Sequence, residues 1–212
     1  MDPAICSKVV MNLRQKYSHH SLDTGHRFVE STLSILKKRG VHAGASPELL
    51  DDFTQMISRN YRIREVTTGL ASPKDGLFRY VTFCGFRPEA EKALKELSYK
   101  KEDFFATGKT VSDLTWVYLS GDKSYMEGEE STFNRPILLT KTDRDSVDKC
   151  LEGDYFDTVI NDRKGNLTGW IEYSGTQDYK FPDMHVIKEI ELIALIISAL
   201  LDQSDAEQRG AH

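Results

Sequence analysis

The segment YFDTVINDRKGNLTGWIEY, residues 155–173, predicts a β-hairpin and decides the fold. Two stretches rich in β-branched and aromatic residues, 155–160 and 167–173, flank a polar turn that closes on Gly165. This is the pattern of two antiparallel strands joined by a tight turn. In the loop that follows, Pro182 holds the residue before it in an extended conformation, and Asp183 is placed to cap a new helix.

The helix that begins at Asp183 is apolar on one face at first and on nearly every side later. From Leu192 to Leu201 only Ser198 is polar. A helix that is apolar all round must be covered on more than one side, yet this run is shorter than the roughly 20 apolar residues of a membrane span. We therefore expect one face to pack on a sheet and another to meet a second helix, from this chain or from a partner subunit.

Hydrophobic spacing elsewhere predicts helices first and strands afterwards. The helical segments are 4–17, 28–36 and 49–57, the last with the start signal Ser46-Pro47. The strand-like segments are 61–70, 77–86, 114–119 and 137–139, and a further helix starts at Pro88. Because helices and strands do not alternate, we predict an α+β fold, an antiparallel sheet with helices on one face. We expect a helical segment over 1–59, a sheet domain over 60–202 and a disordered tail over 203–212.

Composition and charge limit the possible functions and the compartment. A net charge of −5 at pH 7 argues against general nucleic-acid binding. Three widely spaced cysteines, Cys6, Cys84 and Cys150, follow a start that lacks the features of a signal peptide. We therefore expect a cytoplasmic protein with reduced thiols and no membrane span.

Histidine placement argues against several kinds of catalysis. No histidine lies between Ala43 and Met184, so the sheet domain has none except His185 to act as a base or as a metal ligand. This weakens hydrolase, zinc and histidine-ligated haem hypotheses together. We therefore predict no catalytic residue and no metal site, and the sequence identifies no cofactor.

Aromatic residues are dense in the sheet domain, and some of them are expected to line a pocket. Trp and Tyr are common where an apolar ligand body meets a few polar contacts. We expect the pocket on the face of the sheet away from the long helix. The candidate ligand-binding residues are Tyr80, Cys84, Phe104, Phe105, Trp116, Tyr118, Asp157 and Trp170.

The chain resembles a GAF domain, the small-molecule sensory module of many signalling proteins. LFRYVTFCGFRPEA (77–90) and SYKKEDFF (98–105) resemble a version found in sensor histidine kinases. Residues 158–173 are similar to the closing hairpin of the family, and 184–201 to its terminal dimer helix, so the resemblance covers about 60–202. It implies a GAF/PAS-like sheet with the N- and C-terminal helices on one face and a ligand pocket on the other. It also implies a homodimer through Ile190, Ile193, Ile197, Leu200 and Leu201.

The signatures of the cyclic-nucleotide, methionine-sulfoxide-reducing and bilin-binding GAF subtypes are not evident, and the sequence carries no output domain.

Our leading hypothesis is a non-enzymatic sensor that binds a small molecule and signals through a dimer helix bundle to a histidine kinase or another output partner. One alternative is a structural dimerisation module without a ligand. Another is a haem or redox sensor that uses Cys84 or Cys150. The sequence names neither the ligand nor the output partner.

Overall fold

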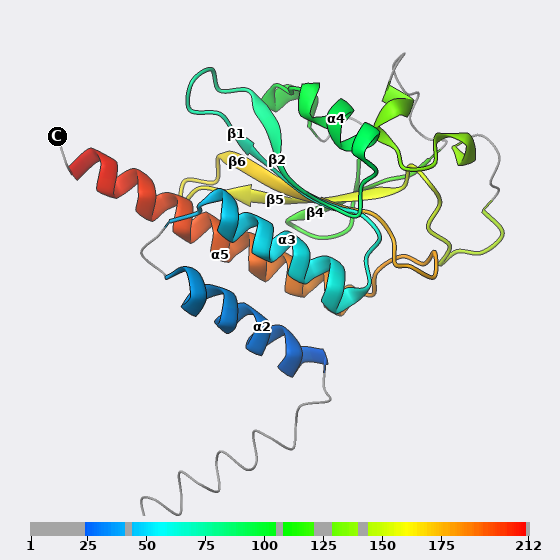
Figure 1. The fold of residues 1–212 in the computed structure, drawn as a ribbon, viewed down its shortest axis with the longest axis horizontal. Helices are drawn as coiled ribbons and strands as arrows, with labels where there is room; N and C mark the ends of the chain where they lie inside the picture. Colours follow the sequence, from blue (N-terminus) through cyan, green and yellow to red (C-terminus); the bar gives the residue numbers. More distant parts are fainter. Residues whose placement is uncertain (1–23, 41–43, 105–107, 121–128, 140–143, 211–212) are drawn as a thin grey trace, which may run out of the picture.

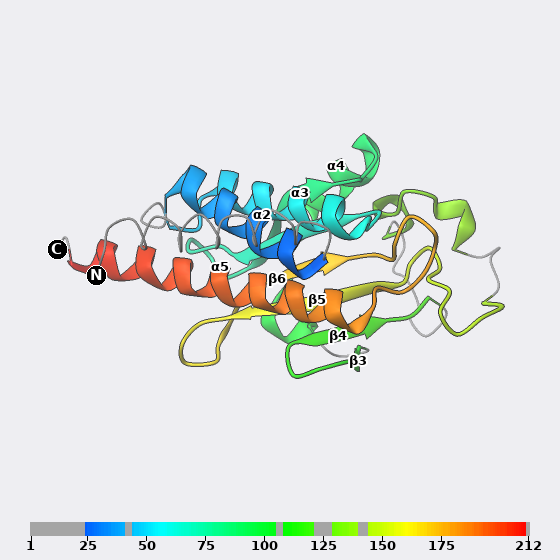
Figure 2. The same cartoon turned by 90° about the horizontal axis from the view of Figure 1, so that it is seen from below.

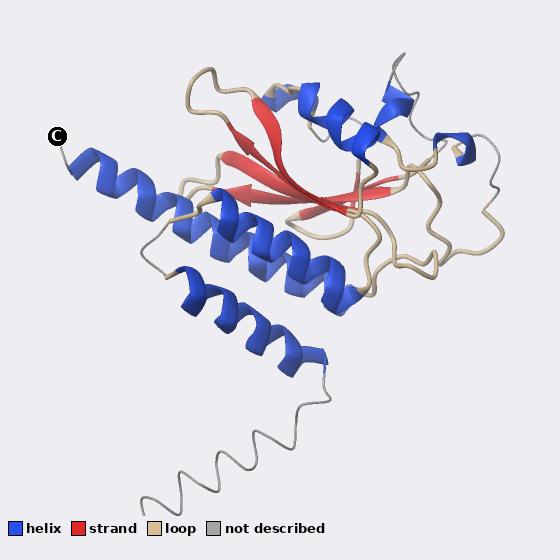
Figure 3. Cartoon of the chain, viewed as in Figure 1, coloured by secondary structure: helices blue, strands red, loops and turns tan. Residues whose placement is uncertain are grey.

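An antiparallel sheet forms the centre of the computed structural model, which describes residues 24–40, 44–104, 108–120, 129–139 and 144–210. In this described part the sheet has six strands in the order β2-β1-β6-β5-β4-β3 (Figures 1 and 3). The strands are β1 (Val66–Ala71), β2 (Phe78–Cys84), β3 (Lys109–Thr110), β4 (Thr115–Tyr118), β5 (Tyr155–Asn161) and β6 (Leu167–Tyr173).

Strands β5 and β6 form the predicted hairpin, in which Val159 pairs with Trp170. The Asp162 carboxylate holds the turn by accepting hydrogen bonds from the backbone N–H groups of Lys164 and Asn166, both at 2.8 Å. Gly165 has a φ of 79°, a left-handed conformation that favours glycine. The hairpin prediction is therefore confirmed, together with its turn.

Helices precede, interrupt and follow the sheet. They are α2 (Thr24–Arg39), α3 (Pro47–Tyr61), α4 (Pro88–Glu96) and α5 (Met184–Gly210), with short 3-10 helices η2 (Lys101–Asp103), η3 (Glu129–Thr132) and η4 (Pro136–Leu138). Ser46 caps α3 as predicted, because its hydroxyl accepts a hydrogen bond from the N–H of Leu49 at 3.3 Å. The helix expected over 4–17 lies outside the described residues, and α5 continues past the expected domain end at 202.

The short strand expected at 137–139 is wrong, since η4 occupies this place. Pro136 has no N–H group for a strand ladder, and its fixed φ suits the first position of a helical turn. Ile137 is 63% exposed, so no sheet face covers it.

One face of the sheet is covered by α3 and α5, and α2 packs against α3 on the outside (Figure 2). Side chains of β1, β5 and β6 meet these helices in a single hydrophobic core. Its fully buried members include Leu49, Leu50, Ile57, Ile160 and Ile171. The α+β prediction with N- and C-terminal helices on one face is confirmed.

Within the described residues, no helix combines the length and the apolar character that a membrane crossing requires.

The residues predicted to form a dimer interface on α5 belong instead to the core of the single chain. Ile190, Ile193 and Ile197 are 0% exposed and Leu200 is 5% exposed, while Leu201 is half-buried against the same core. The helical period of 3.6 residues places these side chains on the face that meets the sheet and α3. The opposite face of α5 exposes Leu192 (47%) and Leu195 (54%). The expected interface residues are therefore corrected.

Two identical substitutions test this placement of the core. Ile193→Ala removes a fully buried side chain and should lower the free energy of unfolding by about 2–5 kcal/mol. Ile137→Ala removes an exposed one and should change it by less than about 0.5 kcal/mol. Urea unfolding followed by circular dichroism measures both, and equal losses would contradict the assignment.

Candidate functional site

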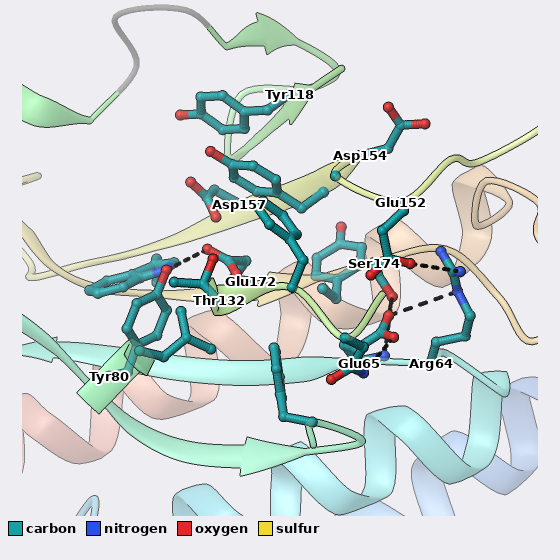
Figure 4. A pocket seen from close by; sticks show the side chains of 18 of the residues that line it. Arg64, Glu65, Tyr80, Tyr118, Thr132, Glu152, Asp154, Asp157, Glu172 and Ser174 are labelled. Atoms are coloured by element: carbon teal, nitrogen blue, oxygen red, sulfur yellow. Dashed lines mark hydrogen bonds and ion pairs between the residues drawn. The ribbon is translucent and has the colours of Figure 1, made fainter. Parts of the chain in front are cut away.

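The face of the sheet opposite α3 and α5 bounds a cavity of about 140 Å³ (Figure 4). Its walls come from strands β2, β4, β5 and β6, from Leu94 of α4, from the segments around η2 and η3, and from the segments just before β1 and β5. Helix α4 lies on this side of the sheet (Figure 1). The volume is close to that of an engineered cavity of about 150 Å³ that binds one benzene molecule. The cavity is thus large enough for a small ligand.

Aromatic rings gather around Trp170, which is 1% exposed and lines the cavity. The Trp170 ring centroid lies 5.0 Å from that of Phe104, 5.1 Å from Tyr80 and 6.2 Å from Tyr99. All three pairs have edge-to-face geometry, the arrangement that aromatic quadrupoles favour. Tyr118 and Tyr155 form a separate stacked pair, with centroids 4.6 Å apart, on the same cavity.

Gly69 of β1 makes room for this cluster. A Cβ atom at position 69 would lie 2.1–2.4 Å from three ring atoms of Trp170. Real Cβ atoms do not approach other atoms so closely, and a rigid indole ring has no nearby alternative position within a packed cluster. The glycine therefore allows the indole ring to cross the β1 backbone.

Two carboxylates stand side by side at the aromatic end of the cavity. Asp157 of β5 and Glu172 of β6 are cross-strand partners, and both line the cavity (Figure 4). The hydroxyl of Tyr80 donates a hydrogen bond of 2.8 Å to Glu172. Burial, and after it the negative charge of Glu172, raises the pKa of Tyr80 well above its ordinary value. Burial and the charge of Asp157 likewise raise the pKa of Tyr155. Both phenols therefore stay protonated at neutral pH.

Arg64 stands at the other, polar end of the cavity (Figure 4). Its side chain is 9% exposed, with Nε 3.8 Å from Glu65 and Nη1 3.8 Å from Glu152. These separations fit ion pairs but exceed hydrogen-bond lengths, and neither nitrogen has a hydrogen-bond partner among the described residues. The guanidinium also lies 4.7 Å from the centre of the Tyr179 ring. Arg64 is thus already surrounded by two negative charges and an aromatic face.

Further charged and polar contacts hold the remaining acidic groups of the polar end. Glu152 accepts hydrogen bonds from Arg135, one of them from Nη2 at 3.0 Å. Asp154 accepts two from Arg144, both at 2.9 Å. The side-chain amide of Asn134 donates to Glu65 at 2.8 Å. These carboxylates therefore have partners that fix their positions.

A chain of buried hydrogen bonds joins α5 to the cavity wall. Glu191 of α5, 6% exposed, accepts a bond of 3.0 Å from the Thr115 hydroxyl. Thr115 is 2.8 Å from the hydroxyl of Thr158, which lies 3.2 Å from the hydroxyl of Tyr173. This chain runs over the helix-facing side of the sheet and ends at Tyr173, which packs in the core and also lines the cavity.

Glu191 is ionised in the folded protein. Burial raises the pKa of Glu191, but hydrogen bonds from Lys188, Ser112 and Thr115 together lower it below its ordinary value. A carboxyl group with a lowered pKa adds stability at a pH above its unfolded value, and this stability is lost as the pH falls through the folded value.

Five of the eight predicted ligand-binding residues line the cavity: Tyr80, Phe104, Tyr118, Asp157 and Trp170. Trp116 lies on the same face of the sheet, opposite Asp157 in register, and packs against the Trp170 cluster without lining the cavity. Phe105 lies outside the described residues.

Cys84, like Trp116, does not line the cavity, and it lies on the opposite face of the sheet. Thr68 pairs with Thr82 and Gly69 with Tyr80, so Val81 is an extra residue that forms a β-bulge in β2. The bulge reverses the alternation of side chains along the strand, so Tyr80 faces the cavity and Cys84 faces α3. There the Cys84 thiol donates to Gln55 at 3.4 Å.

Sequence reasoning missed several lining residues. Tyr155 and Glu172 lie two positions from Asp157 and Trp170 on the same strands, so strand alternation could have identified them. Arg64, Glu65 and Tyr99 come from connecting segments, where no local pattern indicates a cavity.

The structure also bears on the redox alternative. Cys150 is 0% exposed, and burial, followed by the charge of Asp154, raises its pKa to about 12. A thiol with this pKa is a poor nucleophile and a poor metal ligand, since both roles need the thiolate. Among the described residues, no group of three or more His, Cys, Asp or Glu side chains is placed to hold a metal ion.

A Gly69→Ala substitution tests the packing of Trp170 against the β1 backbone. The new Cβ should displace Trp170, lowering the free energy of unfolding by about 1–3 kcal/mol and changing the near-UV circular dichroism of the tryptophans. Gly25→Ala is the matched control, because its Cβ would meet no atom closer than 3.9 Å. An unchanged near-UV spectrum and unchanged stability for Gly69→Ala would contradict the packing described.

A Glu191→Gln substitution tests the charge at the end of the hydrogen-bond chain. The wild-type protein should lose stability on acidification from about pH 5 to about pH 3, around the ordinary glutamate pKa. The variant should lose less over this interval, and Thr115→Val, which removes one donor, should fall between the two. Urea unfolding at a series of pH values measures the slopes; identical slopes for all three proteins would rule out the role assigned to Glu191.

No protein-family model matches the sequence, and a comparison with curated proteins finds no relative. Solved structures do match. The GAF domain of a putative sensor histidine kinase from Pseudomonas syringae pv. tomato has a TM-score of 0.53 at 9% identity, covering 94% of this chain and 97% of that one. The GAF domain of A. aeolicus nlh2 in an inactive state has a TM-score of 0.52 at 13% identity, covering 85% and 98%. Bacteriophytochrome RpBphP3 from the photosynthetic bacterium R. palustris has a TM-score of 0.52 at 12% identity, covering 85% and 39%. Identities this low establish the fold alone, and the chain has the GAF fold.

Proposed function

We propose that this chain is a non-enzymatic sensory module that binds a small molecule in the cavity and reports it through the helix layer. The observation that carries the proposal is the cavity of about 140 Å³, bounded by aromatic rings and carboxylates on the face of the sheet opposite the core. Small-molecule sites are typically concave and combine aromatic side chains with polar groups held in fixed positions, as this cavity does. The GAF fold, which this chain shares with a domain of a putative sensor histidine kinase, supports the same function.

The hydrogen-bond chain from Tyr173 to Glu191 supports a route for the signal. A ligand shifts a conformational equilibrium only by its differential affinity for the two states. A ligand in contact with Tyr173 would favour one position of its hydroxyl, and therefore one arrangement of Thr158, Thr115 and Glu191. Because Glu191 belongs to α5, a change in these hydrogen bonds would change how α5 packs in the helix layer.

The output surface that we propose is the exposed apolar face of α2 and α5. Val29 (48% exposed) and Leu33 (44%) on α2 and Leu192 and Leu195 on α5 leave apolar side chains uncovered in the single chain. Contact with the same helices of a second copy would bury them, which supports a homodimer and, beyond it, a histidine kinase or another signalling partner. The wide spacing of the three cysteines supports a reducing, cytoplasmic location.

A structural dimerisation module without a ligand is the second candidate, because the exposed helix face does not depend on the cavity. Replacing Leu192 and Leu195 by glutamate should dissociate the dimer under either function. A ligand that binds the cavity distinguishes the sensor from this alternative.

The sensor function predicts a ligand that can be recovered or added back. Mass spectrometry of molecules released from natively purified protein should find one compound enriched over a control protein purified in the same way. A library of small metabolites screened by thermal denaturation should contain a stabilising compound. At a concentration 100 times its Kd, this compound should raise the free energy of unfolding by about 2.7 kcal/mol.

Thr115→Val provides the coupling control. It should leave the Kd of that compound within about threefold but remove the ligand-induced change in amide hydrogen exchange of α5, because the exchange reports helix opening. No enriched compound and no stabilising compound would contradict the sensor function.

A further inference from the structure

Arg64 brings buried hydrogen-bond donors without an acceptor to the polar end of the cavity. Its side chain is 9% exposed. The nitrogens Nε and Nη1, which carry three of the five N–H groups of a guanidinium, have no hydrogen-bond partner in the described part of the chain. Buried polar groups are nearly always hydrogen-bonded, and a charged donor left without an acceptor is costly. Because Arg64 lines the cavity, a bound molecule can supply the acceptor.

The two nearest carboxylates do not fill this role, because other donors hold them. Glu65 accepts hydrogen bonds from the side-chain amide of Asn134 at 2.8 Å and from the hydroxyl of Ser174. Glu152 accepts one from the backbone N–H of Arg135 at 2.9 Å and another from its Nη2 at 3.0 Å. Each carboxylate stays 3.8 Å from Arg64, which is too far for a hydrogen bond.

Tyr179 fixes the guanidinium next to the cavity. The centre of its ring lies 4.7 Å from the guanidinium of Arg64 and 4.9 Å from that of Arg135. Tyr179 has a φ of 61°, a left-handed conformation that is uncommon for a residue other than glycine. Such a conformation persists only where surrounding contacts impose it, and here the N–H of Cys150 donates to the Tyr179 carbonyl at 2.8 Å. Arg64 therefore rests on a ring whose own position is held.

The ion pairs at this end of the cavity are already balanced in charge. They join three arginines to three acidic residues: Arg64, Arg135, Arg144, Glu65, Glu152 and Asp154. A ligand carboxylate would add a negative charge beside Glu65 and Glu152, and a ligand cation would face the guanidinium. Like charges brought together in this way oppose binding. An uncharged acceptor, such as a carbonyl oxygen, has neither cost.

The aromatic end of the cavity offers ring surface for the rest of the ligand. Trp170, Tyr80 and Phe104 line it, and the ring centroids of the last two lie 5.1 and 5.0 Å from that of Trp170. The volume of about 140 Å³ limits the ligand to roughly one benzene ring with a short substituent. A ligand of this size that contacts both ends combines an apolar part with one acceptor group.

We propose that the cavity binds a small uncharged carbonyl compound, whose oxygen accepts hydrogen bonds from Arg64 and whose apolar part lies against the rings around Trp170. This inference rests on the proposed sensory function and specifies the chemical class of its ligand.

Three probes of nearly equal size and shape test the charge and the acceptor: benzamide, benzoate and benzamidine. The first is an uncharged acceptor, the second an anion, and the third a cation that lacks the oxygen. Titration of the full chain at neutral pH, followed by NMR spectroscopy, should show benzamide binding at least about tenfold tighter than either of the others. Benzamide should also shift the Nε–H resonance of Arg64, because this proton enters a new hydrogen bond.

Acetophenone separates the carbonyl oxygen from the amide N–H group of benzamide. It keeps the oxygen and lacks the donor, so it should bind within about threefold of benzamide. Much weaker binding of acetophenone would assign the recognition to the amide N–H and contradict the proposed class.

Arg64→Lys places the effect at Arg64. It keeps the positive charge near Glu65 and Glu152 but replaces the planar guanidinium, so benzamide should bind at least about tenfold more weakly. Loss of one Nε–H resonance in this variant also identifies the signal of Arg64. Arg64→Met is the second variant if the first fails to fold, which circular dichroism will show. Arg163→Lys, at a side chain that is 77% exposed, is the matched control and should change the binding of no probe.

Benzoate or benzamidine binding as tightly as benzamide would overturn the inference and leave the sensory function standing. Unchanged affinity for benzamide in the Arg64 variant would do the same. Failure of all four probes to bind also overturns it, while the recovered or stabilising compound decides the sensory function separately.

Discussion

Burial of the apolar face of α5 against β5 and β6 is the interaction on which the rest of the structure depends. Ile190, Ile193 and Ile197 meet the sheet from one side and form the core there. Side-chain alternation then divides each central strand in two. On β5, Phe156 and Ile160 enter the core, while Asp157 is directed to the opposite face. A sheet with its core on one face can hold charged and aromatic groups around a cavity on the other.

The helix-facing side of the sheet also carries a hydrogen-bonded chain that connects α5 to a residue of the cavity wall. Thr115 and Thr158 face the helices, yet their hydroxyls and that of Tyr173 form a chain that ends at the cavity. Glu191 is a buried acidic residue among the buried apolar side chains of α5. Buried polar groups are stable only when they are hydrogen-bonded. Glu191 therefore ties α5 to the sheet at a defined position, where the proposed signal would pass from the cavity to the helix.

Much of the fold was predictable from local sequence, and part of the site was too. The hairpin at 155–173, the Ser46-Pro47 helix start and the α+β class follow from period, turn and capping signals that act within a few residues. Trp170, Tyr80 and Asp157 were identified because they are aromatic or acidic residues on strands. The position of Cys84 was not predictable, because one bulged residue in β2 reverses its face. Periodicity identified an apolar face of α5 but not that the same side chains would be used up in the core of the single chain, and the contribution of Arg64 likewise depends on packing between distant segments.

The central claim is that the sheet keeps an open cavity on the face opposite its core. A crystal structure of the purified protein, at a resolution that shows ordered solvent, tests it most directly. The account predicts density for a bound molecule or for ordered water in the volume bounded by Trp170, Asp157 and Glu172. Side chains of the chain itself filling that volume, with Trp170 packed against the segment around η3 and no space between them, would contradict it.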